Sequence, residues 1–364
     1  MSLGWPWWRK SSGSQLVVSW SDRVLGYVQS RKRPDGSHEV LKMGVERQGV
    51  DSLESFAIRL QALRLDGHQV SVMLRPDQYQ LFQIETPAVP VDELRSAARY
   101  QIREMLDSAL DDVVIDVMGV GRTPQKGATH LFVVAATKVV VKEVLDLGRA
   151  MRWTVSVIDI QEAAQRNLQS ALAAGPRAKD LANTALLVLD GHKAVLTISA
   201  EQDLCYSRRF DLPAGFLTSS WLEEAVAPDR VVAAPVDFEP GHEFVPDYNV
   251  DGVSYGTDYS NMSVSPQVQV STDANARYLE NARRLAAEVQ RSLDVWSRSW
   301  SSLPIDRIYV FAGKRSVSFA QWMSQELGQT ITPVNISDLF PELDAMNSED
   351  KAFCLPLLGV LMRA

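Results

Sequence analysis

The chain has 364 residues, of which 46% are hydrophobic and 23% are charged, and its formal net charge is −8. This length favours two or more lobes over one compact core, and this composition excludes a disordered protein. The negative charge argues against bulk binding of nucleic acid. Cys205 and Cys354 stand apart from each other in apolar runs, which predicts reduced thiols rather than a metal site or a disulfide.

Residues 1–13 are predicted to form a flexible tail that is both aromatic and basic. Tryptophan prefers the membrane interface and basic side chains prefer anionic headgroups, so a weak contact with a membrane surface is one expectation. The alternative expectation is a tail that is disordered or that packs on its own lobe. No apolar run reaches the roughly 18 residues of a spanning helix, and no signal peptide is recognisable, which predicts a cytoplasmic protein. The residues expected at the membrane surface are Trp5, Trp7, Trp8, Arg9 and Lys10.

Residues 14–175 are expected to form a first lobe of mixed α/β structure. Two β-prone runs at 15–20 and 25–29 flank a Ser-Asp-Arg turn and predict an opening hairpin, and a third strand follows at 38–43. Alternating helical and β patterns then predict helices at 53–63, 92–106, 139–151 and 162–173, and strands at 69–74, 79–84, 113–118, 131–136 and 154–158. A Gly-Pro pair inside 174–183 is typical of a linker.

Residues 184–364 are expected to form a second lobe. Strands at 185–190, 194–199 and 204–209 follow one another as in the opening hairpin, so the sequence predicts a weak internal repeat. The stretch 228–275 has five prolines, eight acidic residues and one basic residue, which predicts a long, acidic insertion that is partly extended and poorly ordered. Beyond it we expect helices at 279–300, 317–327 and 352–362, and strands at 307–311 and 330–334.

Several segments resemble known proteins in the same order along the chain. Residues 185–210 resemble the second phosphate hairpin of actin-like ATPases, and residues 305–313 resemble the strand and adenine-side turn of that fold. Residues 288–297 resemble a signature helix of the MSHA-pilus protein MshI and its relative PilM. Residues 358–363 and 90–116 resemble the closing helix and the extra subdomain of this family. The chain thus resembles the PilM/MshI family over about 14–364, apart from 228–275.

This resemblance implies an α/β, actin-like (ribonuclease H-like) fold of two lobes, with an α+β subdomain inserted in the first lobe at about 80–160. It also implies a scaffold or adaptor of a type IV or MSHA-type pilus machine, peripheral to the inner membrane. The expected partner is the short cytoplasmic tail of a membrane-anchored protein like PilN or MshJ, bound in a groove near 80–160. The expected contacts, each of which also fits a core position, are Tyr79, Leu81, Phe82, Ile84 and Tyr100.

The resemblance further implies a nucleotide cleft, in which two hairpin turns offer backbone N–H groups to phosphates and an acid at each turn orients Mg²⁺. In the first hairpin, Trp20 stands about where the acid is expected, and its bulk is predicted to fill the phosphate space. The adenine-side turn has Ala-Gly in place of Gly-Gly. We therefore predict a vestigial site, with ATP and Mg²⁺ disfavoured and no catalytic or metal-ligating residues. The candidate nucleotide contacts are Asp190, Gly191, Lys193, Ala312 and Gly313.

Other interpretations remain open from the sequence. The Asp190-Gly191 pair also fits a plain hairpin turn, and Lys193 fits a solvated lysine. An actin-like ATPase or sugar phosphotransferase is a second function, although it needs a carboxylate and a glycine in the first hairpin. A type II secretion component of the same superfamily is a third. Those chains continue into a transmembrane helix, whereas this one stops at Ala364.

Overall fold

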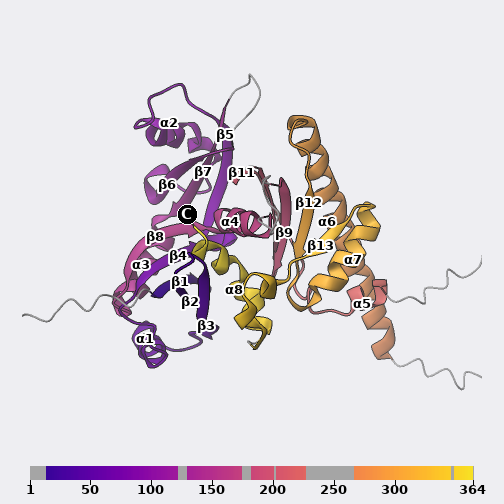
Figure 1. Cartoon of the computed structure of the whole chain (residues 1–364), viewed down its shortest axis with the longest axis horizontal. Helices are drawn as coiled ribbons and strands as arrows, with labels where there is room; N and C mark the ends of the chain where they lie inside the picture. The colour runs from indigo at the N-terminus through magenta and orange to yellow at the C-terminus, as the bar shows by residue number, and fades with distance from the viewer. Residues whose placement is uncertain are drawn as a thin grey trace, which may run out of the picture.

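The computed structural model describes residues 14–121, 129–173, 182–200, 202–226, 266–345 and 348–363. They form two five-stranded sheets, one three-stranded sheet and the helices that pack on them (Figure 1). The five residues expected at a membrane surface lie outside the described residues, as does 228–265. Among the helices of the described part of the chain, none has both the length and the apolar character needed to cross a bilayer.

The first sheet has the strand order β3-β2-β1-β4-β8, in which β1, β2 and β3 are antiparallel and β4 and β8 run parallel to β1. Helices α1 (Leu53–Ala62) and α3 (Lys138–Ala150) pack on its outer face, where Phe56 and Leu147 join one apolar core. The strands are β1 (Ser14–Ser21), β2 (Val24–Lys32), β3 (His38–Arg47), β4 (Gln69–Leu74) and β8 (Thr154–Ile160).

The second sheet repeats this arrangement in the order β11-β10-β9-β12-β13, so the predicted internal repeat is confirmed. Its outer face is covered by α5 (Trp221–Val226), α6 (Pro266–Ser299) and α7 (Ser316–Leu327), whose aromatic side chains form the core. The strands are β9 (Thr184–Asp190), β10 (Lys193–Ala200), β11 (Asp203–Asp211), β12 (Arg307–Phe311) and β13 (Ile331–Pro333).

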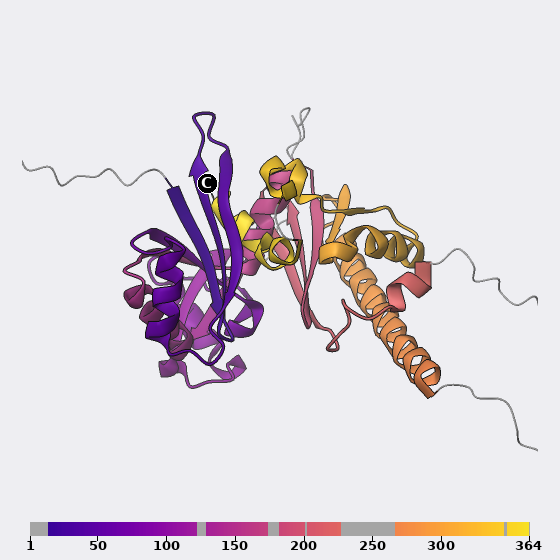
Figure 2. The same ribbon diagram turned by 90° about the horizontal axis from the view of Figure 1, so that it is seen from below.

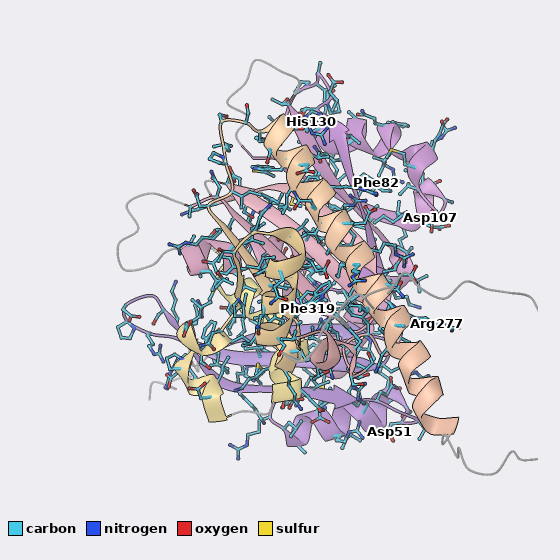
Figure 3. The ribbon with its side chains drawn as sticks, turned by 90° about the vertical axis from the view of Figure 1, so that its right-hand side faces the viewer. Asp51, Phe82, Asp107, His130, Arg277 and Phe319 are labelled. Atoms are coloured by element: carbon cyan, nitrogen blue, oxygen red, sulfur yellow. The ribbon has the colours of Figure 1, made fainter. Side chains whose placement is uncertain are left out.

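Helix α6 is longer than expected. It begins at Pro266, so residues 266–275 are helical, whereas 228–275 was predicted to be partly extended and poorly ordered. Proline is favoured in the first turn of a helix because its fixed φ suits the helix and its missing N–H has no partner to lose there. Figure 2 shows the N-terminal end of α6 extending past the other elements of the second lobe, and Figure 3 shows the helix crossing that face, with Arg277 on it.

The inserted subdomain spans residues 79–137, which is shorter than the expected 80–160. It contains the sheet β5-β7-β6 and helix α2 (Leu94–Gln101), whereas α3 and β8 return to the first sheet. Figure 3 shows its Phe82 and His130 at the opposite end of the molecule from Asp51. The strands are β5 (Tyr79–Glu85), β6 (Val113–Gly119) and β7 (His130–Thr137). Short 3₁₀ turns occur at Pro76–Gln78, Arg103–Met105, Leu110–Asp112, Gly313–Arg315, Ile336–Asp338 and Pro341–Ala345.

Helices α4 (Gln161–Ala173) and α8 (Ser348–Leu361) lie between the two large sheets (Figure 1). Helix α4 ends the first half of the chain but packs against β9, β10 and β11. Helix α8 ends the second half of the chain but packs against β1, β2 and β3. The range 184–364, expected to form the second lobe, therefore includes a helix that packs on the first. The two lobes therefore share one inner core, to which Val17, Leu186 and Leu358 all belong.

Cys354 of α8 lies in this inner core, with Sγ 3.4 Å from the carbonyl oxygen of Gly44. Burial raises the pKa of the thiol from 9.0 to about 12. Above pH 9 the unfolded chain loses this proton while the folded chain keeps it. We therefore expect the contribution of this thiol to the free energy of unfolding to be constant well below pH 9 and to fall as the pH rises toward 12. Urea unfolding between pH 8 and pH 10 measures this change. The free energy of unfolding of the variant Cys354→Ala should fall less steeply with pH than that of the wild type. Equal slopes would contradict the prediction.

The candidate site in the cleft between the lobes

The second hairpin and the turn after β12 bring the predicted nucleotide contacts to two neighbouring cavities, both of which Asp190 and Gly191 line. Asp190 pairs with Lys193 across a two-residue turn, and Gly191 in this turn has a φ of 58°, which favours glycine. A cavity of about 650 Å³, here called the large cavity, is lined by Asp190, Gly191 and Gly313. Lys193 instead lines a neighbouring cavity of about 170 Å³, the small cavity, and Ala312 is buried.

The first hairpin has no carboxylate at the end of its first strand; its acid, Asp22, comes one residue later, in the turn, where it lines the small cavity. Its last pair is Ser21 with Val24, which corresponds to Asp190 with Lys193 in the second hairpin. Ser21 therefore stands where the acid would be. Trp20 does not fill the phosphate space, because alternate side chains of a strand point to opposite faces. It is buried in the outer core, where its ring stacks on Phe56 with centroids 5.4 Å apart.

The space between the hairpins holds the side chain of Arg75 instead. Arg75 follows β4 directly, and its side chain is only 6% exposed. Nη1 donates to Oδ2 of Asp190 at 2.6 Å, and Nη2 donates to the carbonyl oxygen of Phe353 at 2.7 Å. Nε and Nη2 also donate to Oγ of Ser19, at 3.3 and 3.1 Å. The guanidinium thus joins strands of both lobes and α8.

Other charged side chains of the small cavity also pair across the cleft. Oδ1 of Asp77, in the first lobe, lies 3.6 Å from Nζ of Lys193 in the second. Its Oδ2 lies 3.6 Å from Nε2 of His192, a contact that becomes an ion pair when the imidazole is protonated. Hydrogen bonding to Asp211 and the nearby carboxylates raise the pKa of Lys193, so this lysine stays charged and paired.

A second ionic contact between the lobes is formed by Tyr79, Glu162 and Arg209, here called the interlobe triad. Glu162 of α4 is fully buried, and its Oε1 lies 2.7 Å from Nη2 of Arg209 on β11. The hydroxyl of Tyr79 donates to the other carboxylate oxygen, and Nη1 of Arg209 donates to the carbonyl oxygen of Pro76 at 2.8 Å. Burial, followed by the adjacent carboxylate, raises the pKa of Tyr79 well above its ordinary value, so its hydroxyl remains a donor.

The expected partner contacts are scattered by the fold. Tyr79 belongs to the interlobe triad and Ile84 is buried in the subdomain core, so neither is free to contact a partner. Leu81 and Phe82 are half-buried on opposite faces of β5. Tyr100 on α2 is 71% exposed. The five residues therefore do not share one surface, and Tyr100 is the most exposed of them.

Sequence reasoning missed Arg75, Glu162 and Arg209. The sequence did carry a signal for Arg75, because a charged residue that directly follows an apolar strand is placed at the end of a sheet. Nothing in the local pattern distinguished Glu162 or Arg209 from solvated residues. Among the residues that the structure describes, no three His, Cys, Asp or Glu side chains are grouped so as to hold a metal ion.

No protein-family model matches the chain, and no curated protein matches it in sequence. Solved structures do resemble it. A chain of a "PilM-PilN type IV pilus biogenesis complex" is 17% identical, with a TM-score of 0.63, over 96% of this chain and 99% of that one. The cytoplasmic domain of EpsL, an inner-membrane component of the type II secretion system of Vibrio cholerae, is 15% identical over 72% of this chain and 94% of that one, with a TM-score of 0.39.

A protein of unknown function from Bacteroides thetaiotaomicron with an actin-like ATPase fold is 9% identical over 99% of this chain and 100% of that one, with a TM-score of 0.45. The repeated sheet order, the two helices between the sheets and the inserted subdomain all lie within the region matched by the first of these structures. The chain therefore has the α/β, two-lobed actin-like ATPase fold that the sequence predicted.

Proposed function

We propose that the chain is a cytoplasmic scaffold of a type IV or MSHA-type pilus assembly complex, peripheral to the inner membrane. Its partner would be the cytoplasmic tail of a membrane-anchored protein resembling PilN or MshJ. The observation that carries this proposal is the similarity of fold, over nearly the whole of both chains, to a chain of a PilM–PilN complex. Because one fold can serve many functions, the test of this proposal is binding of the partner's tail.

ATP hydrolysis has no part in the proposed function. Hydrolysis in this fold requires a metal ion, phosphate clamps and a positioned water together. Here Asp190 is bound by Arg75, and Ser21 occupies the corresponding position of the other hairpin. A scaffold instead needs its lobes held in a fixed arrangement. The interlobe triad and the shared inner core hold them so.

The inserted subdomain carries exposed apolar side chains that a peptide could contact. Tyr100, together with Val91 and Met105, lies on or next to α2 and is largely exposed. Exposed aromatic side chains of this kind are the usual anchors of protein interfaces. We propose that the partner's tail packs against these side chains, with Tyr100 as its principal contact.

Replacing Tyr100 by alanine should weaken binding of the tail about tenfold, because an aromatic anchor contributes more than 1 kcal/mol. The measurement is fluorescence anisotropy with labelled N-terminal peptides of the membrane-anchored pilus protein. The matched control is Val317→Ala, which truncates a similarly exposed side chain on α7 and should leave the affinity unchanged. Equal affinity in wild type and both variants would remove Tyr100 from the proposed interface.

A further inference from the structure

We propose that Arg75 decides what the cleft can hold: its guanidinium takes the place of a metal ion and phosphates, and joins the two lobes without any ligand. This inference goes beyond the proposed function, since it concerns the cleft and not the partner's tail. In a nucleotide-bound cleft of this fold, positive metal charge and bridging phosphates connect the two hairpins. In this chain the connection comes from one side chain.

The geometry satisfies the guanidinium almost completely. An arginine has five N–H donors in a fixed plane. Those of Arg75 reach a hydroxyl of the first sheet, a carboxylate of the second and a carbonyl oxygen of α8. The ring of Phe353 stacks on the same group, with its centroid 3.9 Å from Cζ, which adds a cation–π contact. Gly26 leaves the room for this ring, because a Cβ there would lie 2.7 Å from Phe353 Cε1.

The same geometry excludes a divalent cation from Asp190. A metal ion that approached this carboxylate would meet a buried guanidinium already 2.6 Å from one of its oxygens. Two cations on one carboxylate repel each other, and the charge of Asp190 is already balanced by Arg75. Lys193, the other cation of the small cavity, faces Asp77, as does the imidazole of His192, so neither side chain is free to meet a phosphate. Arg75 is therefore the residue that keeps a metal ion from Asp190 and fills this part of the cleft with a side chain of the protein itself.

The test compares Arg75→Ala with Arg95→Ala in the full chain by thermal unfolding. Arg95 also pairs with a carboxylate at 2.9 Å, that of Asp116, but both partners are about 70% exposed. We expect Arg75→Ala to lower the Tm by about 5–10 °C, because it leaves a half-buried carboxylate unpaired. Arg95→Ala should leave the Tm within error.

Chemical rescue separates the charge of Arg75 from its packing. Guanidinium chloride at about 10 mM should recover much of the lost Tm of Arg75→Ala, since it can bind the folded variant at the vacated position. An equal concentration of NaCl should not. In Asp190→Asn, which keeps Arg75 but lacks the carboxylate, guanidinium should recover nothing. An unchanged Tm in Arg75→Ala, no rescue in it, or equal rescue in both variants would overturn the proposal.

The wild-type chain supplies a result that does not depend on how the variants fold. With MgCl₂ alone, or with Mg-ATP, its Tm should change by less than about 1 °C, because a ligand that binds only the folded state must stabilise it. A Mg²⁺-dependent rise of several degrees would overturn the proposal for Arg75. Such a rise would leave the tail-binding proposal intact, since the anisotropy measurement reads that separately.

Discussion

Replacing Gly359 by alanine is expected to destabilise the protein by about 3 kcal/mol or more, although alanine is the better helix former by about 1 kcal/mol. Gly359 lies where α8 crosses α4. A Cβ at this position would come within 2.0 Å of the carbonyl oxygen of Ala164 and 2.7 Å of its carbonyl carbon. Backbone atoms cannot turn away as a side chain can, so one of the two helices must move. Urea unfolding followed by circular dichroism measures the loss.

The matched control is Gly119→Ala at the end of β6. Its φ is not in the left-handed region, and no atom lies within 4 Å of the Cβ that alanine would add. This variant should have the same urea midpoint of unfolding as the wild type. If Gly359→Ala were equally stable, α4 and α8 could not cross as closely as described, and the shared inner core would lose its support.

Replacing Glu162 by glutamine is expected to cost about 3–5 kcal/mol, the usual cost of removing one partner of a buried ion pair. The substitution preserves the shape of the side chain but leaves Arg209 buried without its carboxylate. It also replaces one of the two oxygens that accept from Tyr79 and Arg209 with an NH2 group, which can only donate. Because the two charged residues come from different lobes, the loss weakens the contact between the lobes as well as the fold of each. Thermal and urea unfolding both report it.

A double-mutant cycle separates the pair from the packing around it. The variant Glu162→Gln/Arg209→Met removes both charges, so it should be more stable than Glu162→Gln alone. A surface pair, Arg291 with Glu288, provides the comparison, since Arg291 is 70% exposed and its replacement by methionine should have little effect. Additive losses in the double variant would mean that Glu162 and Arg209 do not act as a pair.

The strands and their repetition were predictable from local patterns, whereas their order in each sheet was not. Both opening hairpins have β-prone runs joined by short polar turns, and the repeat of this pattern at 185–209 predicted two sheets built alike. Asp190 and Gly191 were predictable because a polar pair that ends an apolar strand marks a turn. These features depend on neighbours in the sequence, and hence on the periodicities that a sequence displays directly.

The interior of the cleft was not predictable in the same way. Trp20 was assigned to the cleft because the register of the first hairpin was unknown, and a shift of one residue moves a side chain to the other face of a sheet. Arg75 and Asp190 lie 115 residues apart in the sequence, and Glu162 and Arg209 lie 47 apart. Such pairs form only once the lobes close, so no local pattern identifies them.

The proposed scaffold role is tested most directly by titrating the wild-type chain with labelled N-terminal peptides of the membrane-anchored pilus protein, with and without Mg-ATP. We expect saturable binding with a Kd of about 1 µM to 100 µM, and the same Kd in both conditions, because Arg75 already occupies the position between the two hairpins. Failure of every such peptide to bind would contradict the proposed function, and binding that requires Mg-ATP would contradict a scaffold that works without nucleotide.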